Sequence, residues 1–304
     1  MRIGFNGTGS VQHADIKRIA KDAATARDGG LASYWLADHP TGGFDAITAL
    51  ALAGQLVPDL ELGTAIVPSF PRHPMALAAQ ALTVNDALDG RFTLGIGLSH
   101  ASMMQELGIE FAKPIRHLKE YLSILGPLLT DGRADFSGEL LSSTARVFKK
   151  PAEPVRLLVA ALGPQALKVT GRLADGTTLA WVGDKTIREH IVPTISDAAA
   201  AAGRPSPRVL ATLPLCVTEQ PAKIREVIDA NLGSYGQLPS YKAMFEREGV
   251  SSPSGVAVVG SRAEVEDHIG RIAAAGATDF APTIFGLTGD ERHQSMELLT
   301  DLSK

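Results

Sequence analysis

Apolar residues along this chain follow two alternating patterns. Short runs rich in β-branched and aromatic residues are separated by longer segments in which apolar residues recur every three or four positions. The short runs predict strands at residues 2–6, 33–37, 60–67, 92–97, 155–161, 177–182, 208–217 and 278–284. The longer segments predict helices at residues 13–28, 45–56, 74–88, 114–129, 164–173, 185–202, 222–232, 240–248, 262–275 and 290–302.

Strands that alternate regularly with helices predict an α/β protein, and eight such units are typical of a single (β/α)8 TIM barrel. A doubly wound open sheet is the competing architecture, but eight units over 304 residues fit the barrel better. Two segments, 130–150 and 233–255, break the repeat, so we expect insertions after strands four and seven, the first as a hairpin. No long linker interrupts the chain, and residues 1–304 are expected to form one domain.

Composition and charge narrow the function classes. The formal net charge of −4, with both signs interspersed, argues against a surface for nucleic acid or an anionic membrane. Cys216 is the single cysteine and cannot form an internal disulfide. There is no secretory pattern and no apolar run of about 18 residues, so a soluble cytoplasmic protein is expected. Neither convincing metal-ligand spacing nor a GxSxG elbow occurs, which disfavours metal and nucleophilic mechanisms.

The second predicted strand ends in a carboxylate and an imidazole, Asp38 and His39, just before the Gly-rich turn Thr41–Gly43. Active sites of parallel α/β proteins form at the carboxyl ends of strands. An imidazole there can move a proton near neutral pH, and a neighbouring carboxylate can orient a ligand. The same residues also fit a helix cap at Asp38 and a hydrogen-bonded turn residue at His39, and both interpretations stay open here.

Two further strand ends offer candidate binding loops. Gly95 and Gly97 alternate along the fourth strand, and a loop with Ser99 and His100 follows; missing side chains would let a flat ligand approach the backbone. The fifth strand ends in the small residues Ala160 and Ala161 before a helix. The amides of Gly163, Gln165 and Ala166 at the start of that helix could bind an anion, with Pro164 tolerated in the first turn. Ordinary tight βα turns would give the same patterns. A Rossmann dinucleotide site is disfavoured, because Gly4, Gly7 and Gly9 lack the fingerprint spacing.

Four motifs together resemble the bacterial luciferase-like superfamily, and within it the branch that uses the deazaflavin coenzyme F420. The motifs are YWLADH (34–39), LGTAIVPSFPRHPMALAAQALTVNDALDGRFTLGIG (62–97), ALGPQALKVTGRLADG (161–176) and GATDFAP (276–282). The long central block carries most of the resemblance to the superfamily. The Asp-His pair of the first motif indicates deazaflavin rather than flavin.

The resemblance implies roles for individual residues. Asp38 and His39 match a pair beside the deazaflavin ring, with His39 as acid/base or substrate-orienting group. Thr64, Ala65 and Ile66 match a bulge behind the ring, with a cis peptide expected between Ala65 and Ile66. Two loops match the binding site of the ribityl-phosphate tail; the first is Gly97, Leu98, Ser99 and His100, and the second is Ala160, Ala161, Gly163, Pro164 and Gln165.

One departure from the branch limits the substrate. Its sugar-phosphate dehydrogenases carry Thr-Gly-Glu after the Gly-x-Gly strand, where Leu98, Ser99 and His100 stand here. This argues against glucose 6-phosphate and leaves His39 and His100 as candidates for proton transfer, with Asp38 beside them. The resemblance thus implies an oxidoreductase that moves a hydride between C5 of coenzyme F420 and a small organic substrate.

The same sequence features also fit two other functions. A monooxygenase that uses reduced FMN belongs to the same superfamily, and a non-catalytic flavin or deazaflavin carrier could use the same barrel. The resemblance also implies a homodimer. Substrate identity and reaction direction are not predicted, although Phe136, Tyr235, Tyr241 and Phe245 in the two insertions indicate an apolar rim around the pocket.

Overall fold

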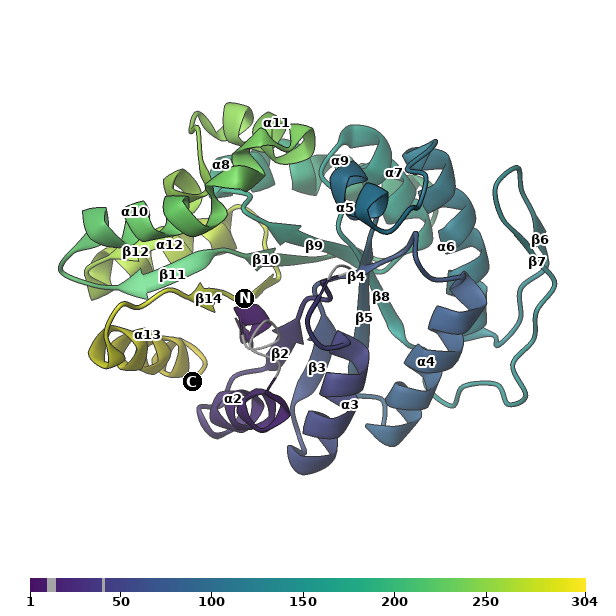
Figure 1. The fold of residues 1–304 in the computed structure, drawn as a ribbon, viewed down its shortest axis with the longest axis horizontal. Coiled ribbons are helices and arrows are strands. Elements are labelled where there is room, and N and C mark those ends of the chain that lie inside the picture. Colours follow the sequence, from purple (N-terminus) through teal and green to yellow (C-terminus); the bar gives the residue numbers. More distant parts are fainter. Residues whose placement is uncertain (10–14, 40–41) are drawn as a thin grey trace.

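A closed parallel barrel forms the centre of the molecule (Figure 1). The structure, a computed structural model, describes residues 1–9, 15–39 and 42–304. The barrel strands are β1 (Arg2–Asn6), β2 (Ser33–Leu36), β3 (Glu61–Thr64), β5 (Phe92–Gly97), β8 (Arg156–Val159), β9 (Gly176–Ala180), β10 (Arg208–Thr212) and β13 (Asp279–Phe280). Neighbouring strands pair in parallel, and pairing between β3 and β5 completes the closure. The predicted (β/α)8 barrel is therefore confirmed.

Helices surround the barrel (Figure 1). They are α2 (Ile16–Asp28), α3 (Ala46–Leu56), α4 (Pro74–Ala87), α5 (Ala101–Glu106), α6 (Pro114–Thr130), α7 (Pro164–Leu173), α8 (Asp184–Thr186), the π-helical turn η1 (Ile187–Ile191), α9 (Val192–Ala201), α10 (Pro221–Leu232), the 3-10 turn η2 (Gly233–Gln237), α11 (Pro239–Glu248), the 3-10 turn η3 (Pro253–Val256), α12 (Arg262–Ala274) and α13 (Gly289–Leu302). Capping side chains fix the first residue of several helices. In α3, for example, the Asp45 carboxylate accepts a hydrogen bond from the Thr48 amide at 2.7 Å. His13, the predicted start of the first helix, and Thr41 of the predicted turn lie outside the described residues.

Three predicted strands are interrupted. The third divides into β3 and β4 (Val67–Pro68), the seventh into β10 and β11 (Pro214–Val217), and the last into β13 and β14 (Thr283–Ile284). β11 leaves the barrel wall and pairs in parallel with β12 (Val258–Gly260) on one side and with β14 on the other, which forms a small three-stranded sheet. We did not predict β12 or α5, because each is too short to show a period of its own. In the insertion at 130–150, β6 (Phe136–Ser137) and β7 (Ser142–Ser143) form the expected antiparallel hairpin.

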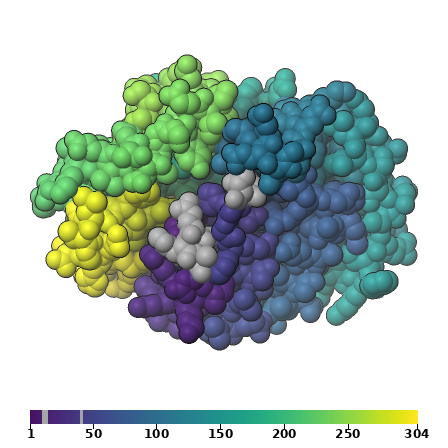
Figure 2. Space-filling view, viewed as in Figure 1, coloured from purple at the N-terminus to yellow at the C-terminus, as the bar shows by residue number. Residues whose placement is uncertain are grey.

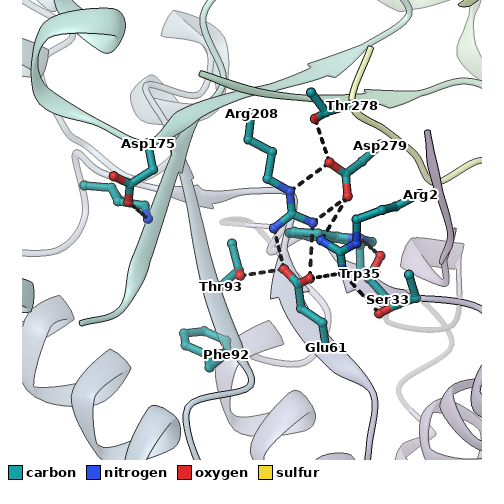
Figure 3. A network of polar contacts seen from close by, with 12 residues as sticks. Arg2, Ser33, Trp35, Glu61, Phe92, Thr93, Asp175, Arg208, Thr278 and Asp279 are labelled. Atoms are coloured by element: carbon teal, nitrogen blue, oxygen red, sulfur yellow. Dashed lines mark hydrogen bonds and ion pairs between the residues drawn. The ribbon is translucent and has the colours of Figure 1, made fainter. Parts of the chain in front are cut away.

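Inside the barrel, the amino ends of the strands are closed by an ion network (Figure 3). The Arg208 guanidinium donates to Glu61 at 2.5 Å and to Asp279 at 2.7 and 2.9 Å. Trp35 is fully buried, and the guanidinium carbon lies 5.4 Å from the centre of its ring. Gly63 makes room for that ring, since a Cβ there would lie 2.2 Å from it. Burial alone would raise the pKa of Glu61, but hydrogen bonds from Arg208 and Thr93 lower it below its usual range. We call Arg2, Glu61, Thr93, Arg208 and Asp279 the barrel floor.

The helices of the described ranges are all too short or too polar to cross a lipid bilayer.

Candidate active site

A cavity of about 450 Å³ opens at the other end of the barrel, above the carboxyl ends of the strands. One inward-facing residue from each barrel strand or its extension forms its base: Asn6, Ala37, Ala65, Gly97, Ala160, Ala180, Thr212 and Thr283. Most of these side chains are small, so the barrel is open at this end. The segments α5 and α10–α11 stand over the same face in the space-filling view (Figure 2), and Met103 and Tyr241 from them line the cavity.

The Asp-His pair at the end of β2 borders this cavity. Asp38 accepts from the Arg72 guanidinium at 2.8 Å, and the other amino group of Arg72 donates to Asp45 at 2.6 Å. Tyr121 in turn donates to the Arg72 carbonyl at 2.9 Å. The cation holds the Asp38 carboxylate in one position, and Asp45, not Asp38, caps α3. The helix-cap interpretation of Asp38 is therefore wrong.

Two imidazoles, those of His39 and His100, line the same cavity. His100 follows β5 and packs against the Tyr241 ring at 5.6 Å between centroids, with the ring planes tilted by 53°. Burial lowers the pKa of His100 below its ordinary value, because the charged imidazolium loses solvation there. His100 is therefore mainly neutral at pH 7 and able to accept a proton. The pair that sequence reasoning proposed for proton transfer meets in one cavity.

The interruption between β3 and β4 forms the predicted bulge. The peptide bond between Ala65 and Ile66 is cis, as the resemblance implied. Ala65 and Ile66 line the cavity, whereas Thr64 does not: its hydroxyl is fully buried and exchanges 2.8 Å hydrogen bonds with the Gly95 backbone. Thr64 thus supports the bulge from behind. A Cβ on Gly97 would lie 3.0 Å from the Ile66 side chain, so glycine keeps the base of the cavity flat at this point.

The first predicted tail loop lies entirely along the cavity. Gly97, Leu98, Ser99 and His100 all line it. Ser99 has a φ of +64°, a left-handed conformation that is uncommon outside glycine and that turns the chain sharply after β5. The Ser99 hydroxyl lies 3.6 Å from the Met103 sulfur at the start of α5.

Only some residues of the second predicted tail loop line the cavity. Ala160 and Gly163 line the cavity, as does Ala166, which lies one turn into α7. Ala161 is buried in the core, and Pro164 and Gln165 are exposed outside the lining. No side chain caps the start of α7, which leaves its first amides open toward the rim beside Gly163.

Sequence reasoning missed several residues of the site. Arg72 was not singled out, because nothing near it in sequence shows that it pairs with Asp38. Thr8 was also missed: its hydroxyl donates to the Asn6 side chain and accepts from the Ala37 amide at 3.0 Å, tying β1 to β2 at the mouth. Of the aromatic residues expected at the rim, Tyr235 and Tyr241 line the cavity, whereas Phe245 is buried in the core and Phe136 lies at the hairpin.

The described residues hold no cluster of three or more His, Cys, Asp or Glu that could bind a metal ion.

Comparison with known proteins agrees with this geometry. An F420-dependent glucose-6-phosphate dehydrogenase of Kineococcus radiotolerans is 29% identical over 241 residues, which is 74% of this chain and 71% of that protein. A second, from Nakamurella multipartita, is 27% identical over 215 residues, 66% of this chain; the match spans 63% of the length of that relative. The F420-dependent tetrahydromethanopterin reductase of Methanopyrus kandleri superposes with a TM-score of 0.82 at 20% identity, covering 98% of this chain and 97% of that one, and so shares the fold.

The family model described as luciferase-like monooxygenase matches residues 3–279, which include every strand of the barrel up to the start of β13 and all the loops around the cavity except the last. The chain belongs to the luciferase-like monooxygenase family.

Proposed function

We propose that this protein is an oxidoreductase that transfers a hydride between coenzyme F420 and a small organic substrate. One observation carries the proposal: Asp38 and His39 share a single cavity with the Ala65–Ile66 bulge and the uncapped start of α7. The cavity therefore combines a proton-transfer group, a flat apolar base and amide donors at one mouth. The names of the curated relatives, which specify coenzyme F420, support the choice of cofactor.

The residues present fit a flat ring with an anionic tail. Ala65, Gly97 and Ala160 form a shallow base, and a Cβ on Gly97 would fill it, since it would lie 3.0 Å from Ile66 and 3.2 Å from Ala160. At Gly163, in contrast, a Cβ would meet nothing within 4 Å, so the chain is open to a ligand there. The open amides of α7 suit a phosphate because they carry the positive end of the helix dipole.

When bound, the deazaflavin would supply the carbon that gives or takes a hydride. The protein would supply the rest. In the oxidation of an alcohol, an imidazole nitrogen of His39 would take the proton from the hydroxyl oxygen as the hydride leaves the carbon that bears this hydroxyl; in reduction, it would return that proton. Asp38, which Arg72 holds in one position, would orient a ligand, and the neutral His100 would be a second proton acceptor.

Titration of the purified protein with coenzyme F420 and with FMN tests the proposal. We expect tighter binding of coenzyme F420, followed on tryptophan and cofactor fluorescence, and redox turnover with a panel of alcohols, ketones and activated alkenes. Tighter binding of FMN would favour the monooxygenase alternative. Tight binding of coenzyme F420 without turnover of any panel compound would favour a carrier.

We also propose that residues 1–304 act as one domain and that the protein is a cytoplasmic homodimer. Leu52 and Leu56, one turn apart on α3, are 53% and 71% exposed, which supports an apolar contact between two copies on this helix. Light scattering coupled to gel filtration tests the dimer, and Leu56→Glu should shift the mass to that of a monomer. A monomeric mass for the unmodified protein would contradict the proposal.

A further inference from the structure

The residues described around the cavity include no lysine or arginine. The Arg72 guanidinium, which pairs with Asp38 at the border of the cavity, is shared by the carboxylates of Asp38 and Asp45. Because burial lowers the pKa of His100, its imidazole adds no positive charge at neutral pH. An anionic group in the deeper part of this cavity would therefore lie near the Asp38 carboxylate, with no lysine or arginine among the described lining residues to balance its charge.

Placing an unpaired anion in this part of the cavity costs more free energy than a few weak contacts would recover. Burying an ionised group without a counter-charge is unfavourable by several kcal/mol. The open amides of α7 can offset this cost only for an anion at the rim, where they point. A phosphate on the substrate itself, deeper in the cavity, has no such donors.

An aromatic wall closes the opposite side of the cavity. Trp181 stands at the end of β9, and Tyr235 and Tyr241 come from the inserted segment after β11. The Trp181 ring centre lies 4.0 Å from that of Tyr235 and 4.9 Å from that of Tyr241. Burial raises the pKa of both tyrosines, so each phenol stays neutral. This wall offers apolar area and ring faces, which are the contacts that a flat or cyclic hydrocarbon body requires.

The backbone holds this wall in place. Trp181 has a φ of +56°, and its amide donates to the Thr212 carbonyl at 3.2 Å. A left-handed conformation disfavours a tryptophan by about 1–2 kcal/mol, so the surrounding contacts must enforce it. At the far end of α11, the Glu248 carboxylate accepts from the amides of Lys185 and Thr186 at 3.2 and 2.8 Å. The helix that carries Tyr241 is thereby fixed to the loop that follows Trp181.

One polar group on this side has no partner. The Thr212 hydroxyl oxygen is buried and makes no hydrogen bond to any described residue. Thr212 is two residues beyond Leu210 on β10, so its side chain points into the barrel, and it lines the cavity. A buried hydroxyl normally finds a partner. Rotation of the side chain about its Cα–Cβ bond would turn the hydroxyl toward the cavity, where a substrate oxygen can be that partner, since a hydroxyl both donates and accepts.

We propose that the substrate is an uncharged cyclic ketone or the matching secondary alcohol. Its ring packs against the aromatic wall and its oxygen reaches Thr212. This inference rests on the proposed function for its chemistry. Oxidation of the alcohol transfers the hydrogen on the carbinol carbon, with its electron pair, to the deazaflavin, while the hydroxyl proton passes to His39; the carbon–oxygen bond becomes double. Reduction of the ketone reverses each transfer.

Tryptophan fluorescence gives a binding signal that is independent of turnover. The chain has two tryptophans, and Trp35 is fully buried beside the barrel floor, so a ligand in the cavity changes the emission of Trp181. The probes are cyclohexanone, its charged analogue 4-oxocyclohexanecarboxylate, and glucose 6-phosphate. Each is titrated into the full-length protein, both with and without bound coenzyme F420.

We expect cyclohexanone to bind at least about tenfold more tightly than its carboxylate analogue, and glucose 6-phosphate to give no saturable signal. Tyr241→Ala should weaken cyclohexanone binding about tenfold. Thr212→Val should weaken it roughly fivefold, and Thr212→Ser, which keeps the hydroxyl, should restore it. The affinity for coenzyme F420 serves as the control in each variant and should change less than twofold.

Equal or tighter binding of either anionic probe would overturn the inference, as would the absence of cyclohexanone binding. An unchanged affinity in both Tyr241→Ala and Thr212→Val would also overturn it. Failure of the proposed function is a separate result: if coenzyme F420 does not bind but the neutral probe is still selected, only the cofactor assignment fails. If coenzyme F420 binds and glucose 6-phosphate turns over, only the substrate inference fails.

Discussion

At the amino end of the barrel strands the inward side chains are charged and paired, whereas at the carboxyl end they are small and mostly uncharged. The barrel floor joins Arg208 to two carboxylates and covers the ring of Trp35 (Figure 3). At the mouth, residues such as Ala65 and Gly97 leave an open cavity instead. At both ends, every second residue of the same strands points into the barrel.

The difference separates stability from function within one fold. When every charged group of a buried network has its partner, the network favours one folded structure over alternatives. The same pairing leaves no group free to bind a ligand. The mouth keeps two imidazoles on the wall of an open cavity, and it does so at the expense of packing. In TIM barrels, residues at the amino end of strands generally serve stability and those at the carboxyl end serve catalysis.

The largest effect is expected at the barrel floor. Arg208→Met leaves Glu61 and Asp279 without their shared cation, and we expect it to lower the free energy of unfolding by about 3–5 kcal/mol. Arg204→Met is the control, because Arg204 pairs with the partly exposed Asp175 at 2.9 Å and should cost only about 0–1 kcal/mol. Urea denaturation measures both. Similar losses in the two variants would show that the floor network is not a stabilising unit.

At the mouth, His39→Ala should leave the unfolding midpoint and most of the cofactor affinity intact but lower turnover by about 10²–10³-fold, since the imidazole that takes and returns the substrate proton is removed. His293→Ala is the control, because His293 is exposed on α13, away from the cavity. Steady-state rates with any accepted substrate test this. Unchanged turnover in His39→Ala would transfer the role to His100 or exclude it altogether.

A smaller effect concerns pH. His117 is buried, stacks on Phe70 at 3.8 Å and lies 3.1 Å from the Ser69 hydroxyl. Burial lowers its pKa to about 4, and Glu120 only partly offsets this. Because its pKa is near 6.5 in the unfolded chain, the unfolded state binds more protons between these values. Stability is then complete above about pH 6.5 and falls as pH drops toward 4.

The variant His117→Phe tests that assignment. Removal of the titrating imidazole should flatten the decline of the unfolding free energy between pH 6.5 and 4. Thermal or urea unfolding at several pH values measures the slope, with His73→Phe, at the exposed start of α4, as the control. An unchanged slope would assign the acid sensitivity to the carboxylates of the molecule instead.

The smallest effect is expected where the aromatic wall is anchored. Glu248→Gln keeps the size of the side chain but weakens its two hydrogen bonds to α8, so Tyr241 should be less firmly positioned. We expect KM to rise about two- to fivefold with kcat nearly constant, and Glu246→Gln, on the exposed side of α11, to change neither. A fall in kcat at constant KM would contradict a role in positioning the wall.

Much of the site was predictable from strand ends. Asp38, His39 and Gly97–His100 all follow strands whose buried patterns are clear, and parallel strands bring their carboxyl ends together. Thr64 belongs to the bulge but does not line the cavity, and a sequence pattern does not show which residue of a bulge faces the open side. Gln165 is exposed and lies outside the cavity lining, so its role in tail binding stays a prediction. The start of a helix can be read from Gly163 and Pro164, but the direction in which each residue of the first turn faces cannot.

What the sequence determined by itself is the order of strands and helices, the closure into a barrel and the polar residues at each strand end. These follow from local periodicity and caps, which depend on near neighbours in the chain. The tertiary structure alone decided which distant side chains meet. Arg208 and Glu61 are 147 residues apart, and Trp181 contacts Tyr235 and Tyr241 from a different segment. Periodicity shows which face of its own strand or helix a residue occupies. Which residues lie opposite that face depends on how the barrel closes and on where β11 and β14 bend away from it.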